Sequence, residues 1–198
     1  MREVWLYFEG DPALRAGFHV FFRDLVTMAR DRRIRFRMVA GEADPVSDFA
    51  RGMRQAPAAT HILLIDSEGP DGGDPVGALR RRGDADCLAG LAVAADQVFL
   101  MVQVMEAWFL ADRSTLTEFY GEGFLPGRLP SGARIEDIPK PDVLRGLHDA
   151  TKGSIKQAYH KTRHAPDLLQ RVAVPQVRRQ AANCDRIFSV LGRLLDEA

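Results

Sequence analysis

Three acidic side chains stand where two apolar segments of the sequence end. Glu9 follows segment 3–8, which is rich in aromatic and branched residues, and Asp66 follows the apolar run 60–65. Glu68 lies two residues beyond Asp66, so an extended backbone would point both side chains the same way. Because converging carboxylates repel each other, a hard cation such as Mg²⁺ or Mn²⁺ is a suitable partner for them. The pattern therefore predicts a divalent metal site formed by Glu9, Asp66 and Glu68.

A simpler interpretation of the same acids remains open. Asp is a common turn former, and the glycine- and proline-rich stretch 69–75 follows Glu68 as a predicted loop. On this interpretation the acids only end a strand. The apolar run before Asp66 and the matching Glu9-Gly10 pair favour the functional interpretation.

The elements that must position these acids alternate between strand and helix. The expected strands are 3–8, 34–39, 60–65 and 97–102, with 34–39 half-exposed near a sheet edge. The expected helices run from Asp11-Pro12 to about Met28, from a Ser47 cap to about Gln55, and from about Val104 through Asp112. This alternation predicts an α/β fold with a mostly parallel sheet and helices on both faces. Ligands of such sheets bind beyond the carboxyl ends of the strands.

The expected organisation is a single domain over residues 1–198. An α/β core over 1–120 is followed by an extended loop over 121–141, which holds several glycines and prolines. A helical C-terminal part over 142–198 follows, with helices expected at 142–151, 154–170 and 175–195. Its apolar faces look too thin for it to fold alone, so we expect it to pack on the sheet.

Two further acids and a basic segment are secondary candidates. Glu106 follows the strand 97–102, at the same predicted sheet edge as Glu9 and Asp66, so it is a candidate for the metal site. Alternatively, its carboxylate only stabilises the start of a helix through the helix dipole. Asp112 lies six residues later, roughly on the opposite side of the predicted helix from Glu106, which makes it a weaker candidate for the metal site. Lys156, His160 and Lys161 could contact a substrate phosphate, or they form a solvated basic helix face. Zinc binding by the pair at 160 and 164 lacks an evident third ligand.

Composition limits the classes of function. The chain has 198 residues, with 27 Lys and Arg against 27 Asp and Glu, so its formal net charge is zero. This balance argues against nucleic-acid binding driven by bulk charge, although a local basic patch remains compatible with it. No signal peptide and no apolar run of about 20 residues is evident, so we expect a cytoplasmic protein that does not enter a membrane. P-loop, GxGxxG and GxSxG motifs are absent from the sequence.

Several short stretches together resemble a known family. They are Tyr7-Phe8-Glu9-Gly10, Leu64-Ile65-Asp66-Ser67-Glu68-Gly69, the segment Met105–Asp112, Tyr159-His160-Lys161 and His164-Ala165. The chain resembles the Toprim domain of topoisomerases, primases and OLD-type nucleases, and more closely an uncharacterised family of small bacterial Toprim-like proteins. The resemblance implies a Toprim-like, Rossmann-like fold, a bacterial source, and a role in phage defence or DNA processing with nucleic acid and an ATPase as partners.

The resemblance also implies roles for individual residues. Glu9 would match the Toprim glutamate, as a metal ligand or a general acid and base, and Asp66 and Glu68 would match the Asp-x-Asp pair that holds Mg²⁺. Glu68 departs from that pattern, since the usual second residue is Asp. Its extra methylene would shift a metal by about an ångström or require a bridging water, which puts catalytic efficiency in doubt.

Three functional hypotheses follow. The first is a Mg²⁺-dependent nuclease or phosphoryl-transfer enzyme in which the metal stabilises charge on a phosphate and Glu9 moves a proton. The second is a non-catalytic binding or regulatory subunit with a Toprim-like fold, which the zero net charge slightly favours. The third is a metal-dependent phosphatase that acts on small molecules. A bound metal would favour an enzyme, and a large exposed apolar patch would favour a binding module.

Overall fold

A parallel sheet forms the centre of the protein. The computed structural model describes residues 2–41, 44–70, 73–81, 83 and 86–197, except for the side chains of 80 and 81. In this part of the chain the strands β1 (Glu3–Glu9), β2 (Arg35–Gly41), β3 (Thr60–Asp66) and β4 (Val98–Met101) pair in the order β2-β1-β3-β4. All three pairings are parallel. The predicted α/β fold and the edge position of the second strand are therefore confirmed.

Alternate side chains of the strands enter two different apolar layers. On one face, Leu6 and Phe8 of β1 and Leu64 of β3 belong to a core that includes Phe18 and Phe22. On the other face, Tyr7, Leu63 and Ile65 pack with Phe49 and its neighbours. Because both faces are covered, the strands are nearly continuous apolar runs, as expected for a buried parallel sheet.

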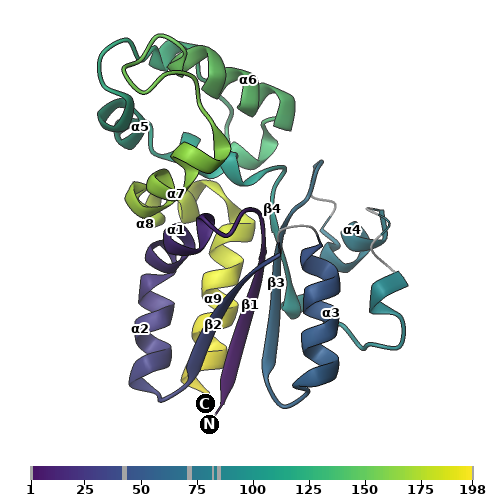
Figure 1. Ribbon diagram of the computed structural model, residues 1–198. Helices are drawn as coiled ribbons and strands as arrows, with labels where there is room; N and C mark the ends of the chain where they lie inside the picture. Colours follow the sequence, from purple (N-terminus) through teal and green to yellow (C-terminus); the bar gives the residue numbers. More distant parts are fainter. Residues whose placement is uncertain (1, 42–43, 71–72, 82, 84–85, 198) are drawn as a thin grey trace.

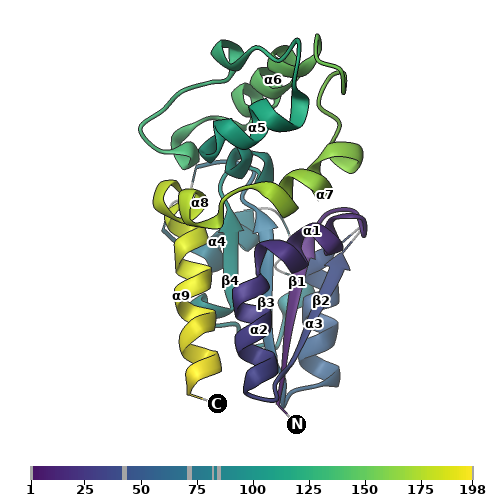
Figure 2. The same ribbon diagram turned by 90° about the vertical axis from the view of Figure 1, so that its left-hand side faces the viewer.

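Helices lie on both faces of the sheet, as predicted (Figures 1 and 2). One face carries α1 (Leu14–Phe21), α2 (Arg23–Asp31) and α9 (Ala182–Asp196), and the other carries α3 (Pro45–Gln55) and α4 (Pro75–Arg81). The remaining helices are α5 (Arg113–Tyr120), α6 (Lys140–Thr151), α7 (Lys161–Arg171) and α8 (Val174–Gln180). Short 3₁₀ helices are η1 (Asp86–Leu88), η2 (Ala95–Gln97), η3 (Met105–Ala111), η4 (Pro126–Arg128) and η5 (Ile135–Asp137).

The C-terminal helical region lies beyond the carboxyl edge of the sheet. Figure 1 shows α5 and α6 above the ends of the strands, with α7 between them and the sheet. Helix α7 packs against α1. The buried apolar cluster on this face runs from the sheet through Trp108 into Leu116, Leu147 and Leu168. The helical part therefore shares one continuous core with the sheet. Its inner side covers the carboxyl edge of the sheet, which is where ligands of parallel sheets bind.

The first predicted helix is divided into two. Helix α1 ends at Phe21 and α2 begins at Arg23, with a change of direction between them that is visible in Figure 2. Phe21 stacks on Trp108 at 4.8 Å between ring centroids, whereas Phe22 lies 5.2 Å from Phe188. Both rings are buried, and a straight helix would point them about 100° apart. The bend lets two adjacent aromatic side chains reach the same core.

Four other predicted helices also have different limits. Helix α3 is capped by Asp44, whose carboxylate accepts the N–H groups of Val46 and Ser47, so the prediction of Ser47 as the cap is wrong. The segment after Val104 is a 3₁₀ helix.

The helix expected at 154–170 begins only at Lys161, after turns in which Gln157 has a φ of 67°. The helix expected at 175–195 is interrupted at Ala181, where Glu136 accepts the N–H groups of Ala182 and Asn183. Residues 71–72 of the predicted loop lie outside the described residues.

Among the residues that the structure describes, we find no helix with the length and apolarity needed to cross a membrane.

Gly10 explains why a glycine follows Glu9. Its φ is +130°, a conformation that residues with a side chain rarely adopt. A Cβ atom at this position would lie 2.5 Å from Cδ1 of Leu14, which is 1% exposed. The glycine thus lets the chain turn from β1 into α1 directly beyond the carboxylate.

We predict that Gly10→Ala lowers the free energy of unfolding by about 1–3 kcal/mol, because it adds both backbone strain and a steric clash. Urea denaturation measures the change. Gly192→Ala is the matched control, since it lies inside α9 with open space around a new Cβ. The control should leave stability unchanged or raise it by up to about 1 kcal/mol. Equal effects of the two substitutions would contradict this account of Gly10.

Candidate metal centre

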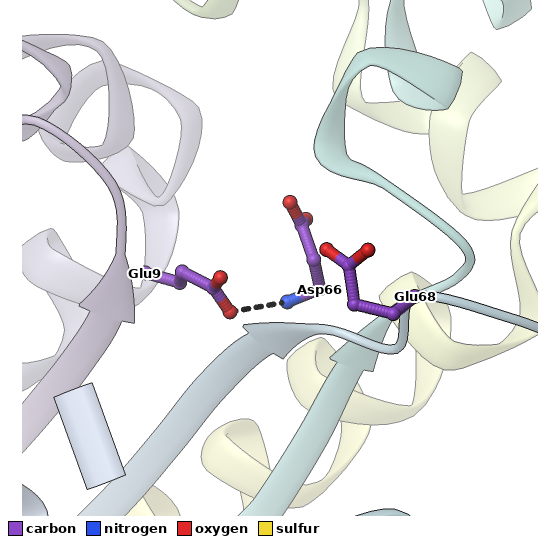
Figure 3. A group of neighbouring side chains, drawn as sticks. All are labelled: Glu9, Asp66 and Glu68. Carbon is purple, nitrogen blue, oxygen red and sulfur yellow. Dashed lines mark hydrogen bonds between the residues drawn. The ribbon is translucent and has the colours of Figure 1, made fainter. Parts of the chain in front are cut away.

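The structure brings Glu9, Asp66 and Glu68 together. Glu9 ends β1 and Asp66 ends β3, and these two strands are neighbours in the sheet. One carboxylate oxygen from each of the three residues lies within 4.8 Å of the other two. Figure 3 shows the carboxylates of Asp66 and Glu68 pointing in the same direction, with Glu9 reaching toward them from the end of β1. Oε2 of Glu9 accepts the backbone N–H of Asp66 at 3.1 Å, which fixes the spacing of the two strand ends.

Glu68 reaches the cluster by a different route from the expected one. The prediction assumed an extended backbone, but β3 ends at Asp66 and Glu68 has a φ of 61°. The chain stays beside β4, because the N–H groups of Ser67 and Glu68 donate to the carbonyls of Met101 and Gln103. A left-handed conformation is uncommon for a residue other than glycine and costs free energy. Here it turns the Glu68 carboxylate toward Asp66.

Asp66 is the buried centre of the cluster. It is 3% exposed, and its Oδ1 accepts the N–H of Met105 at 2.8 Å. Burial raises the pKa of Asp66 to about 7, Lys161 opposes this shift, and the nearby acids Glu106 and Glu9 add to it. A carboxylate in this setting holds a proton near neutrality unless a cation replaces it.

Glu106 lies beside this cluster, so the dipole interpretation alone does not account for it. It is 1% exposed, and its Oε1 accepts a hydrogen bond of 2.9 Å from the hydroxyl of Tyr159. Nζ of Lys161 lies 3.7 Å from Oε1 of Glu106 and 3.7 Å from Oδ2 of Asp66. Within the described part of the chain, Oε2 of Glu106 is buried without a hydrogen-bond partner. An orphaned buried carboxylate oxygen is costly, and it suits a ligand that carries positive charge.

Lys161 supplies positive charge between two buried acids. Burial alone would lower the pKa of this lysine, but the carboxylates of Glu106 and Asp66 raise it above its ordinary value. Its side chain is 40% exposed, so the ammonium group lies between the buried acids and solvent. The structure therefore places this predicted phosphate contact directly at the acids.

Lys140 and Gln103 complete the cluster, and sequence reasoning missed both. Nζ of Lys140 lies 2.6 and 2.5 Å from the two carboxylate oxygens of Glu68. The side-chain oxygen of Gln103 accepts the backbone N–H of Lys140 at 3.1 Å, which holds the start of α6 at the sheet edge. No local signal in the sequence links Lys140 to an acid 72 positions earlier.

The other candidates have different surroundings. Asp112 caps α5 by accepting the N–H of Thr115, and it also accepts the N–H of Ala173. His160 precedes α7, where its backbone N–H donates to Nδ1 of the buried His164. The ammonium group of Lys156 lies 4.5 Å from the ring centre of Phe119, on the helical part of the chain. None of these contacts joins Asp112, His160 or Lys156 to the acidic cluster.

The spacing of the acids fits a hard divalent cation. Mg²⁺ has oxygen ligands at about 2.0–2.1 Å, so two oxygens on opposite sides of one ion lie about 4 Å apart. Neighbouring oxygens on such an ion lie about 3 Å apart. The oxygens of Glu9, Asp66 and Glu68, which are at most 4.8 Å apart, would move closer together by side-chain rotation when the ion binds. Lys140 would have to move from Glu68 for both oxygens of that residue to bind the ion.

This chain belongs to the family DUF4276, a domain of unknown function, whose model matches residues 17–192. The matched range contains Asp66, Glu68 and Glu106, whereas Glu9 precedes it. No match was found among the curated proteins, and none among the solved structures. The family description names no activity.

The raised pKa of Asp66 predicts a specific pH dependence of stability in the metal-free protein. Between the ordinary pKa of about 3.9 and the folded value of about 7, the folded state binds a proton that the unfolded state has released. Stability therefore falls as pH rises through this window. Asp66→Asn removes the titration, so its stability relative to the wild type should increase by a few kcal/mol from pH 4 to pH 8.

Chemical denaturation in the presence of EDTA measures this difference. Asp24→Asn on the exposed side of α2 is the matched control, and its stability should change with pH in the same way as that of the wild type. Parallel curves for Asp66→Asn as well would show that Asp66 titrates alike in the folded and unfolded states.

Proposed function

We propose that this protein is a Mg²⁺- or Mn²⁺-dependent enzyme that cleaves or transfers phosphodiesters. The observation that carries the proposal is the convergence of Glu9, Asp66 and Glu68 at the carboxyl edge of a parallel sheet. Adjacent parallel strands bring Glu9 and Asp66 near each other, but the left-handed backbone of Glu68 turns a third carboxylate toward them against their mutual repulsion. The orphaned oxygen of Glu106 and the strained backbone of Glu68 support the same conclusion.

The proposed ligands are Asp66 and Glu68, with Glu9 and Glu106 at the sides of the site. A bound divalent cation supplies Lewis-acid stabilisation of charge on a phosphate. Lys161 has a partly exposed ammonium group beside Asp66, where it can hold a phosphate oxygen by a charge-assisted hydrogen bond. Glu9, which is half-buried at the end of β1, is placed to exchange a proton with an attacking or leaving oxygen.

The resemblance to Toprim domains supports the type of chemistry. The Glu-Gly and Asp-x-Glu motifs lie at the ends of adjacent parallel strands, which is the arrangement that the resemblance implies for Glu9, Asp66 and Glu68. The resemblance also suggests nucleic acid as the substrate and an ATPase as a partner in phage defence or DNA processing. A small-molecule phosphatase would use the same metal site and is separated from a nuclease by substrate profiling.

The central prediction is that the wild type binds Mn²⁺ and Mg²⁺ saturably and that Asp66→Asn loses this binding. The substitution removes one negative charge and one ligand oxygen while it keeps the size of the side chain. Isothermal titration calorimetry measures binding, and Asp24→Asn should bind metal like the wild type.

Metal binding would justify assays with DNA, RNA and small phosphomonoesters, in which Asp66→Asn should be at least 100-fold slower. If the wild type, Asp66→Asn and Asp24→Asn all gave the same weak heats of titration at millimolar metal, the cluster would instead be an ion-pair network held by Lys140 and Lys161. In that case the proposed enzyme activity would lose its main support.

A second prediction concerns Lys140, which competes with a cation for Glu68. Lys140→Met removes the competing ammonium group while it keeps much of the apolar side chain. Partly exposed ion pairs contribute about 0.2–1 kcal/mol, so metal affinity should rise by up to about fivefold. Arg145→Met, also in α6, removes a charge that is paired with Asp142 and should not change the affinity. Weaker metal binding by Lys140→Met would contradict the competition.

A further inference from the structure

A cavity beside the acidic site is lined mainly by hydrogen-bond donors. It has a volume of about 260 Å³ and lies where the turn before α7 meets α5. Its lining includes Lys156, Gln157 and Arg163. All three are exposed, and neither Lys156 nor Arg163 forms an ion pair among the described residues. The segment 150–166 around them contains no Asp or Glu, although Asp149 and Asp167 flank it, and Lys156 and Arg163 outnumber Asp167 in the lining.

A buried histidine adds a donor to this cavity. His164 lines the cavity and is 4% exposed. Its Nδ1 accepts the backbone N–H of His160 at 3.2 Å, so the hydrogen of the neutral ring must be on Nε2. Burial lowers the pKa of His164, the charges of Arg163 and Lys156 lower it further, and Asp167 opposes this shift, so the neutral ring is favoured. The residues that line the cavity thus include two cations, an amide and a histidine with a donor nitrogen.

The remaining wall limits what the cavity can hold. Phe119 forms part of it, but its ring is covered by Lys156 at 4.5 Å and by Arg171 at 5.5 Å, so it cannot stack on a base. Among the described residues, Asp167 is the one acid in the lining, which also includes Ile155, a residue that is 76% exposed. Ligand pockets for whole small molecules measure about 300–1,000 Å³. A cavity below that range, rich in donors, suits a phosphate-sized anion.

Tyr159 links the cavity to the acidic site. The ring of His164 lies 6.2 Å from the ring of Tyr159, whose hydroxyl donates to Glu106. Lys161, which contacts Asp66, is two residues before Arg163 at the start of the same helix. An extended anion with several phosphates could therefore contact both places at once, whereas a single phosphate could occupy only one.

We infer that this cavity binds a backbone phosphate of a nucleic-acid substrate, next to the phosphodiester that the acidic site acts on. The inference rests on the proposed function for its choice of ligand and adds a second contact point to it. Lys156, Arg163 and the Nε2–H of His164 hold the flanking phosphate and set the position of the strand. Free phosphate or a mononucleotide shares this chemistry but lacks the second contact.

The test is binding of a fluorescein-labelled 30-nucleotide DNA strand, measured by fluorescence anisotropy with EDTA present so that no cleavage occurs. Lys156→Ala/Arg163→Ala should bind at least tenfold more weakly than the wild type. The slope of log affinity against log salt should become shallower by about 0.7–1.4, since each single-strand phosphate contact contributes about 0.7. In the wild type, the ring resonances of His164 should shift during the titration.

The matched control is Arg23→Ala/Arg193→Ala, which removes the same charge from exposed positions on α2 and α9. It should change the affinity less than twofold. Lys156→Gln/Arg163→Gln repeats the test with longer polar side chains, and thermal unfolding confirms that each variant is folded.

The inference would be overturned by no binding of the strand by the wild type at 50 mM salt, by an equal loss in the control variant, or by unchanged His164 resonances. Competition separates the two sources of phosphate, because 10 mM inorganic phosphate should displace the strand only weakly. Complete displacement would mean that the cavity takes a free anion and not a strand. Because the assay contains no metal, a failure of strand binding does not affect the calorimetric test of metal binding at the acidic site. A failure of metal binding likewise leaves the test of strand binding unaffected.

Discussion

The burial of two neighbouring carboxylates is the constraint on which the rest of the structure depends. Asp66 and Glu106 are 3% and 1% exposed, and an isolated charge at such depth is very costly. Among the described residues, the backbone N–H of Met105 donates to Asp66 and the hydroxyl of Tyr159 donates to Glu106. The ammonium group of Lys161 lies between the two acids. These donors come from segments that are far apart in the sequence. The C-terminal region must therefore return to the carboxyl edge of the sheet for the acids to be tolerated there.

Several buried polar contacts hold that returning segment in place. Asp112, which caps α5, also accepts the N–H of Ala173 after α7, so one carboxylate ties two helices together. The hydroxyl of Tyr120 lies 3.1 Å from Nδ1 of His164, and Oγ1 of Thr151 accepts the N–H of Tyr159 at 2.7 Å. Each contact would be weak in water but is worth more in a buried setting, where a lost partner leaves an unsatisfied group. The position of Tyr159 and Lys161 is thus determined from both sides, as a pre-organised site requires.

The sequence was informative where a structural signal is local and failed where partners are distant. The apolar runs that became β1, β3 and β4 and the acids at the ends of β1 and β3 follow from composition and strand topology alone, because parallel strands must end at the same edge. The helix bend at Phe22 depends on which core aromatic groups each ring meets, and the start of α9 depends on a carboxylate from position 136. Lys140 reaches Glu68 from the start of α6, which a hydrogen bond to Gln103 holds at the sheet edge. Such pairings depend on the folded chain, and no pattern of residue spacing in the sequence indicates them.

Equal numbers of acidic and basic residues conceal a separation of charge in space. Four carboxylates gather at the carboxyl edge of the sheet, while the segment 150–166 carries cations and no acids. Lys161 belongs to both regions, since it is part of the basic segment and contacts Asp66. The basic segment would attract a polyanion even without metal, and a divalent cation at the acids would strengthen this attraction by reversing the sign of the potential there. On this arrangement metal binding and strand binding favour each other, because each supplies the charge that the other site lacks.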